Sequence, residues 1–223
     1  MNIVTVIGSP HGMKGNTGRL LSSVEASLKA SGADLTQFDV TRMDLKPCRG
    51  CGSCHKTGQC VIKDDFKTIE AALMKADGIV LASPNYIFSV TAQLKALMDR
   101  CACPIHCQAL EGKYGAAVVT SGGSGSDVVE GYLLHFLRAL GCWTVGSVAA
   151  EAREVEGKSG PGGRFGEAGD LGARMVEAIR RRQTFADQTA ERAAFFARMK
   201  ELISLRKEEW PHEYRYWKSL GRI

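Results

Sequence analysis

Short apolar runs alternate with stretches of helical hydrophobic spacing along residues 1–150. The runs predict strands at residues 1–7, 35–40, 78–82, 116–120 and 143–149. The spacing between them predicts helices that include residues 20–28, 66–73, 92–98 and 128–140. Because strands that alternate with helices form a parallel sheet covered on both faces, we predict an α/β fold with a doubly wound five-stranded sheet.

The chain beyond the fifth strand follows a different pattern. Seven glycines between residues 157 and 172 predict a mobile loop, which could serve as a lid. Helices are expected over residues 173–182 and 187–209, and Pro211 is expected to end the second.

A helical arm at residues 184–223 follows a domain at residues 1–183, in which a cysteine-rich insert occupies residues 48–60. The arm carries an apolar stripe and an aromatic group, formed by Phe195, Met199, Leu202, Ile203, Trp210, Tyr214, Tyr216 and Trp217. This surface has to be buried on the domain or on a neighbouring subunit. Four such side chains at ~1.5–3 kcal/mol each can hold an arm on a neighbour, so we expect an oligomerisation arm.

Composition and charge narrow the class of protein. A hydrophobic fraction of 44% and a charged fraction of 24% are typical of a globular chain and exclude wholesale disorder. The chain lacks an apolar stretch of ~18–20 residues and a signal-peptide pattern, so we expect a cytoplasmic protein without membrane association. The net charge of +5 arises at residues 174–223, where 12 basic residues face 7 acidic ones. Because Arg180–Arg182 is the only tight basic run, nucleic-acid binding is not expected.

The loops after the first, third and fourth strands contain most of the polar chemistry. Ligands of parallel sheets bind beyond the carboxyl ends of the strands, so these loops should form one site. The loop at residues 8–17 leads into a helix, whose free N–H groups favour a phosphate, and Ser9, Asn16 and Thr17 add donors. It matches neither a Walker loop nor a dinucleotide fingerprint, which favours a terminal monophosphate. The alternative is that Asn16 or Thr17 only caps the helix.

The other two loops suit a flat heterocycle. Ser83-Pro84-Asn85-Tyr86 offers backbone N–H groups and an aromatic ring, and the glycines of Ser121–Gly125 let a backbone approach closely. Taken alone, Tyr86 would more often be a core or interface aromatic, and the glycines would be an ordinary loop.

Four of the eight cysteines form the compact motif Cys48-x2-Cys51-x2-Cys54-x5-Cys60. Its spacing lets the thiolates converge on one metal centre. Zinc more often takes two separated Cys-x2-Cys pairs, whereas a [4Fe-4S] cluster tolerates a crowded group of three with an outlying fourth ligand. A zinc site and idle thiols remain the alternatives.

With these motifs the chain resembles the flavodoxin-like NAD(P)H-dependent FMN reductase family over residues 1–150. The resemblance rests on the three loops and on Lys95-Ala96-Leu97-Met98-Asp99-Arg100. The cysteine motif makes it similar to the iron–sulfur flavoproteins, a subgroup of that family with such a motif after the second strand. The arm after residue 184 departs from the core family.

The resemblance implies FMN, a [4Fe-4S] cluster at Cys48, Cys51, Cys54 and Cys60, and NAD(P)H as a possible donor. The implied FMN-binding residues are Ser9, Gly15, Asn16 and Thr17 at the phosphate, Ser83, Pro84, Asn85 and Tyr86 at the isoalloxazine edge, and Ser121, Gly122 and Gly123 on its other side. FMN in this family usually lies near a subunit interface, so a homodimer or a dimer of dimers is implied.

A second group of cysteines, Cys101, Cys103 and Cys107 with His106, lies outside the family pattern. Buried packing thiols, a redox or accessory metal role, and a second cluster all remain open. Cys142 opens an apolar strand and is expected in the core.

No hydrolytic arrangement of side chains can be assigned, and no catalytic residue is predicted. We expect an FMN-dependent oxidoreductase that passes electrons from NAD(P)H or a ferredoxin-like donor, through the cluster and FMN, to a quinone, an oxygen species or a small electrophile. The alternatives are a cluster-free FMN or quinone reductase with structural zinc or free thiols, and a non-catalytic electron carrier.

Overall fold

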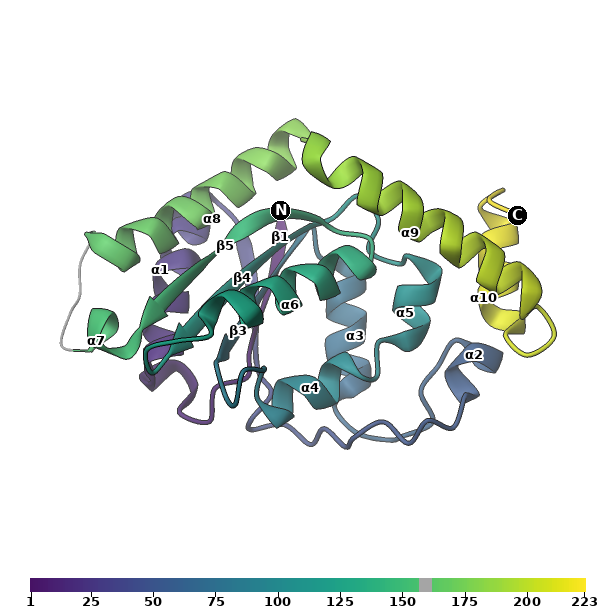
Figure 1. Ribbon diagram of the computed structural model, residues 1–223, viewed down its shortest axis with the longest axis horizontal. Coiled ribbons are helices and arrows are strands. Elements are labelled where there is room, and N and C mark those ends of the chain that lie inside the picture. The colour runs from purple at the N-terminus through teal and green to yellow at the C-terminus, as the bar shows by residue number, and fades with distance from the viewer. Residues whose placement is uncertain (157–161) are drawn as a thin grey trace.

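A computed structural model of the protein describes residues 1–156 and 162–223. It contains a five-stranded sheet in the order β2-β1-β3-β4-β5 (Figure 1). The strands are β1 (Asn2–Ile7), β2 (Asp34–Asp39), β3 (Gly78–Pro84), β4 (Tyr114–Ser121) and β5 (Trp143–Glu151). All neighbouring strands run parallel, and the strand order is that of flavodoxin-like folds, which confirms the predicted fold class.

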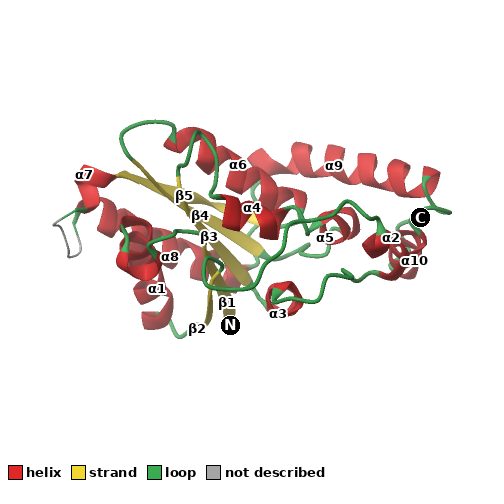
Figure 2. Ribbon diagram, turned by 90° about the horizontal axis from the view of Figure 1, so that it is seen from below, coloured by secondary structure: helices red, strands yellow, loops and turns green. Residues whose placement is uncertain are grey.

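Helices cover both faces of the sheet (Figures 1 and 2). One face is packed by α1 (Asn16–Ala30) and α8 (Gly163–Arg181), and the other by α3 (Phe66–Lys75), α4 (Ala92–Met98) and α6 (Ser126–Ala139). Alternate residues of β1 supply the two cores. Ile3 and Ile7 pack with the first group of helices, whereas Val4 and Val6 pack with the second.

The start of α8 corrects one prediction. Residues 163–172, expected to belong to a mobile loop, are the first half of this helix. The helix forms despite its glycines because Phe165, Ala168, Leu171 and Met175 recur at helical spacing and are buried. Residues 157–161, the other part of the loop that the sequence suggests as a lid, lie outside the described residues.

The C-terminal arm consists of α9 (Ala186–Leu205) and α10 (Pro211–Ser219), which returns against α2 (Ser53–Thr57) and α5 (Ala102–Cys107) (Figure 1). The prediction that Pro211 ends the long helix is wrong, because α9 already ends at Leu205. Pro211 instead begins α10, since the first position of a helix needs no N–H donor. Met199, Ile203 and Trp217 of the arm's apolar stripe are buried within this chain, which is one of the two places expected for this surface, and self-association through the arm stays a prediction. The elements η1 (Gly12–Lys14) and α7 (Ala152–Val155) are short connections.

Candidate functional site

A cavity lies at the carboxyl edge of the sheet, between the loops that follow β1, β3 and β4. Eight of the eleven predicted FMN-binding residues line it: Ser9, Asn16, Thr17, Pro84, Asn85, Tyr86, Ser121 and Gly122. The remaining lining residues are His11, Thr120 and Ala152, of which Thr120 and Ala152 had no distinguishing feature in the sequence. Residues from three distant segments thus converge as the parallel-sheet rule predicts.

The first wall of the cavity is the start of α1. Gly15 is the N-cap residue, and neither a side-chain cap nor an acidic residue neutralises the first turn. The N–H groups of this turn therefore remain suited to an anion, and the alternative that Asn16 or Thr17 caps the helix is not what the structure shows. The Thr17 hydroxyl lies 2.6 Å from that of Thr120, and the Asn16 amide donates to Glu156 at 3.1 Å.

Gly15, Ser83 and Gly123 do not line the cavity. A side chain at Gly15 would meet Cβ of His11 at 2.6 Å, so glycine lets the loop close on itself. The Ser83 hydroxyl donates to the Pro84 carbonyl at 2.9 Å and accepts the Thr91 N–H at 3.2 Å. Gly15 and Ser83 thus shape the loops that line the cavity.

The second wall of the cavity is the loop after β3, where the side-chain oxygen of Asn85 has no hydrogen-bond donor among the described residues. The Asn85 N–H donates to the Thr120 carbonyl at 2.7 Å, and its side-chain amide donates to the Ser124 carbonyl at 2.8 Å. Its Oδ1 is buried and accepts no hydrogen bond within the described part of the chain. A buried acceptor without a partner is costly, so this atom fits a ligand that brings a donor, as the ring N–H of an isoalloxazine does.

The loop tip beside this wall is apolar and strained. Tyr86 and Ser89 exchange two backbone hydrogen bonds, and between them Ile87 and Phe88 have positive φ angles of 51° and 59°. Ile87 is 92% exposed and Phe88 65% exposed. A β-branched residue in the left-handed region is rare, and such strain is concentrated at functional sites.

The four-cysteine motif lies on the loop between β2 and α3, with α2 inside it. Cys48 and Cys51 are exposed, and Cys54 and Cys60 are half-buried. Within residues 1–156 and 162–223, no three of these sulfurs lie within 4.8 Å of one another. In a [4Fe-4S] cube each thiolate binds its own iron, so this donor set need not be as tight as one around a single ion.

Hydrogen bonds and burial shift the pKa values of two of these thiols, Cys51 and Cys54. The hydrogen bond with Ser53 lowers the pKa of Cys51, which favours the thiolate that a metal needs. Burial and the nearby Glu213 carboxylate raise the pKa of Cys54.

Arg100 fastens this loop to the domain. Its buried guanidinium donates to Asp64, to Cys60 Sγ at 3.3 Å and to the Lys46 carbonyl at 3.3 Å, and stacks on Phe66 at 4.3 Å. Burial opposes ionisation of Asp64, but the bonds from Arg100 and two backbone N–H groups outweigh it and lower its pKa. The sequence placed Arg100 in a family motif without indicating this role.

The second group of cysteines lies under α10. Cys101, Cys103 and Cys107 are buried, which is compatible with packing thiols and with metal ligands, and Cys142 is buried in the core as expected. Cys101 donates to the Leu97 carbonyl at 3.4 Å and stands apart, whereas Cys103 and Cys107 contact each other at 3.9 Å.

A buried carboxylate next to these thiols joins the arm to the cysteine motif. Glu213 is fully buried, and its Oε1 lies 2.5 Å from Nδ1 of His55 and 3.7 Å from Nδ1 of His106. Burial alone would raise the pKa of Glu213, but the two imidazoles outweigh it and lower that pKa. Trp210 stacks on both rings, at 4.7 and 4.4 Å. The sequence offered no signal for this cluster, because its members lie on three helices that are distant along the chain.

The strand order, the uncapped helix start and the aromatic loop are those of a flavodoxin-like flavoprotein. The family model for NADPH-dependent FMN reductase matches residues 1–155, and the chain belongs to this family and is a flavin-dependent oxidoreductase. Over its whole length it is 31% identical to an iron-sulfur flavoprotein of Archaeoglobus fulgidus, with 100% of both chains covered.

Two solved structures extend the comparison. The structure of RosB with bound 8-demethyl-8-formylriboflavin-5'-phosphate is 13% identical, has a TM-score of 0.66 and covers 87% of this chain and 86% of RosB. A flavodoxin, a WrbA-like protein from Agrobacterium tumefaciens, is 20% identical, has a TM-score of 0.56 and covers 82% of this chain and 99% of its own. At these identities the likeness shows the fold alone. Among the described helices, none has the length and hydrophobicity needed to cross a membrane.

Proposed function

We propose that the chain binds FMN in the cavity at the sheet edge and a [4Fe-4S] cluster at Cys48, Cys51, Cys54 and Cys60. In this proposal it passes electrons from NAD(P)H or a ferredoxin-like donor to a quinone, an oxygen species or a small electrophile. The observation that carries the FMN assignment is the convergence of an uncapped helix start and an unsatisfied buried amide on one cavity. The likeness to an iron-sulfur flavoprotein over the whole chain supports the cluster.

Different residues of the cavity would bind different parts of FMN. The N–H groups at the start of α1, with Ser9 and Thr17, would hold the phosphate of FMN through hydrogen bonds and the helix dipole. Asn85 Oδ1 would accept a hydrogen bond from the ring edge, and Tyr86 would cover part of it. The backbone at Gly122 leaves open space, since a Cβ there would meet nothing within 4 Å.

The cysteine loop would keep the cluster beside a fixed positive charge. Arg100 donates to Cys60 Sγ and is held by Asp64, so a thiolate at Cys60 gains a charge-assisted hydrogen bond. Hydrogen bonds to the sulfurs are one of the ways in which a protein sets cluster potential.

The bound cofactors supply the redox chemistry, since a cluster carries single electrons and FMN accepts one or two. The polypeptide would position them.

The exposed loop tip supports self-association. Ile87 and Phe88 expose adjacent apolar side chains next to Tyr86 in the cavity wall. A second copy that covers them would bury this patch and close the cavity, so we propose a homodimer or a dimer of dimers.

The visible spectrum and metal content of anaerobically purified protein test the proposal. We expect flavin and iron–sulfur absorption together, with iron and sulfide near four per chain, the composition of a [4Fe-4S] cluster. Cys48→Ser should remove the iron, whereas Cys142→Ser, a buried thiol outside the motif, should not. Zinc in place of iron in the reconstituted wild type would support the cluster-free alternative. Saturable turnover of a quinone by the reduced protein separates an enzyme from an electron carrier.

A further inference from the structure

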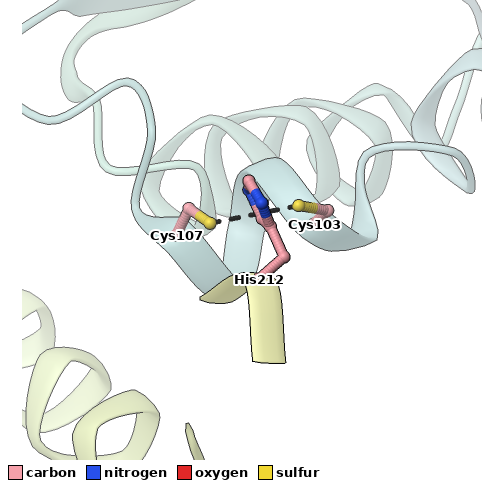
Figure 3. Close-up of side chains that lie close together, drawn as sticks. All are labelled: Cys103, Cys107 and His212. Atoms are coloured by element: carbon pink, nitrogen blue, oxygen red, sulfur yellow. Dashed lines mark hydrogen bonds between the residues drawn. The ribbon is translucent and has the colours of Figure 1, made fainter. Parts of the chain in front are cut away.

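α5 and α10 bring two buried thiols and an imidazole together. Cys103 and Cys107 are 5% and 3% exposed and lie four residues apart on one side of α5. His212, from the start of α10, completes the group, and the two sulfurs and an imidazole nitrogen all lie within 4.8 Å of one another. In the view of Figure 3 the imidazole of His212 is drawn in front of the dashed line that joins the two sulfur atoms.

We infer that Cys103, Cys107 and His212 form a second metal site, separate from the four-cysteine motif, which binds one zinc ion and fastens the C-terminal helix to the domain. Zinc is a borderline-soft ion that prefers thiolate and imidazole ligands in a tetrahedral arrangement. Zn–S bonds of ~2.3 Å at a tetrahedral angle separate two sulfurs by about 3.8 Å. The observed separation of Cys103 and Cys107 is 3.9 Å, nearly twice the length of a disulfide bond.

The close packing of the His212 imidazole against Gly58 is a second, independent observation that supports the site. Gly58 at the end of α2 has a φ angle of 77°, and a Cβ there would lie 2.2 Å from Cε1 of His212. Glycine is therefore required by both the backbone and the ring that occupies the side-chain space. Packing of two thiols would account for Cys103 and Cys107, but not for an imidazole fitted this closely beside them.

The charges of Cys103, Cys107 and His212 favour the binding of a divalent metal ion at this buried site. When a divalent ion binds, each thiol loses one proton, two protons leave for each ion, and nothing is oxidised or reduced. Two thiolates and a neutral imidazole then exactly offset the charge of Zn²⁺, which limits the cost of burying charge. The group offers three ligands from the described residues, so the fourth position is left for water.

A neighbouring group of side chains, His55, His106 and Glu213, connects α2, α5 and α10. His106 and Glu213 directly adjoin Cys107 and His212 in the sequence, and with His55 they form another group of potential ligands within 4.8 Å. In that group Glu213 Oε1 already binds Nδ1 of His55 at 2.5 Å, and the group offers no thiolate, the ligand that a borderline-soft ion prefers. We therefore assign the ion to the thiols and treat Glu213 as a positioning residue.

Zinc analysis of the full chain, purified anaerobically with its cofactors, tests the site. We expect one zinc per chain in the wild type and less than a tenth of that in Cys103→Ser with Cys107→Ser. His212→Gln, a change at a half-buried residue, should lower zinc similarly without disturbing the core. Cys142→Ser is the matched control, because it removes a buried thiol elsewhere and should keep both zinc and iron.

X-ray absorption at the zinc edge, with zinc titration of metal-stripped protein, decides between the alternatives. Two sulfur and two nitrogen or oxygen neighbours, and release of two protons per zinc, support the assignment. Four sulfur neighbours would place the zinc in the four-cysteine motif and overturn it. Zinc retained by the double cysteine variant would instead point to His55, His106 and Glu213. Absence of zinc and of zinc binding in the wild type, or a disulfide between Cys103 and Cys107 in the anaerobic protein, would also refute the site.

Discussion

Replacing Arg100 by leucine should destabilise the protein through the cysteine loop. The side chains of Arg100 and Asp64 are 1% and 0% exposed, and the guanidinium also bonds Cys60 and the carbonyls of Lys46 and Ile62. Its removal leaves the Asp64 carboxylate buried without its charged partner. Breaking one side of a buried pair costs about 3–5 kcal/mol. For a chain of this size that corresponds to a fall in Tm of roughly 6–20 °C.

Thermal and urea unfolding, followed by circular dichroism, measure this cost. The matched control is Arg100→Leu combined with Asp64→Leu, which removes both charges and should recover much of the loss. Lys95→Leu, which breaks an exposed pair with Asp99 one helical turn away, should cost at most about 1 kcal/mol. A Tm unchanged by Arg100→Leu, or a double variant as unstable as the sum of both single variants, would refute the buried-pair reasoning.

The ion pair between Arg100 and Asp64 also makes the stability of the fold depend on pH. The folded-state pKa of Asp64 is lowered, so its contribution to stability is complete above the ordinary aspartate pKa of ~3.9 and is lost as the pH falls below it toward the folded value. The stability difference between wild type and Arg100→Leu should therefore narrow on acidification through this range. A difference that stays constant down to the acid limit of folding would contradict the assignment.

Three further substitutions test other parts of the molecule. Asn16→Leu with Thr17→Val should weaken FMN binding at least about tenfold, a loss of ~1.4 kcal/mol, as measured by fluorescence titration; unchanged affinity would show that the phosphate lies elsewhere. Ile87→Ser with Phe88→Ser should lower the mass measured by light scattering, and an unchanged mass would exclude this loop as the interface. Trp217→Ala should destabilise the chain by about 3–5 kcal/mol, because Trp217 is fully buried; a shift in urea midpoint no larger than that of an exposed control such as Leu205→Ala would contradict this packing.

The sheet-edge cavity could be predicted because strand ends and polar loops are local features of the sequence. Once β1, β3 and β4 run parallel, the loops after them must meet, and so Asn16, Asn85 and Ser121 converge. Glycine content wrongly predicted a loop at residues 163–172, where buried residues at helical spacing form a helix. Composition is a weaker guide than periodicity when one face of a helix is buried.

The surroundings of the cysteines could not be predicted, because they depend on where the arm docks. The periodicity of α9 and α10 shows that they have apolar faces, but not which surface covers them. Only the fold shows that α10 returns to α2 and α5, bringing His212 and Glu213 to His55, His106 and the thiols. The sequence leaves open whether the domain or a neighbouring subunit buries this apolar surface, and the chain's own helices suffice to bury Trp217.

The proposed FMN cavity and the cysteine loop are connected through α4. Before this helix, the Thr91 hydroxyl donates to the Gly8 carbonyl of the loop after β1 at 2.6 Å, and the Thr91 N–H donates to the Ser83 hydroxyl below the second wall. Gly8 packs so closely on the helix that a Cβ there would lie 2.6 Å from Cβ of Leu94. Just after the helix, Arg100 fastens the cysteine loop. Seven helical residues span only about 10 Å, so one short helix, buried along the face of Leu94, Leu97 and Met98, fixes both loops. A change that shifts α4 should therefore disturb flavin and cluster binding together, whereas a change within either loop should disturb only one.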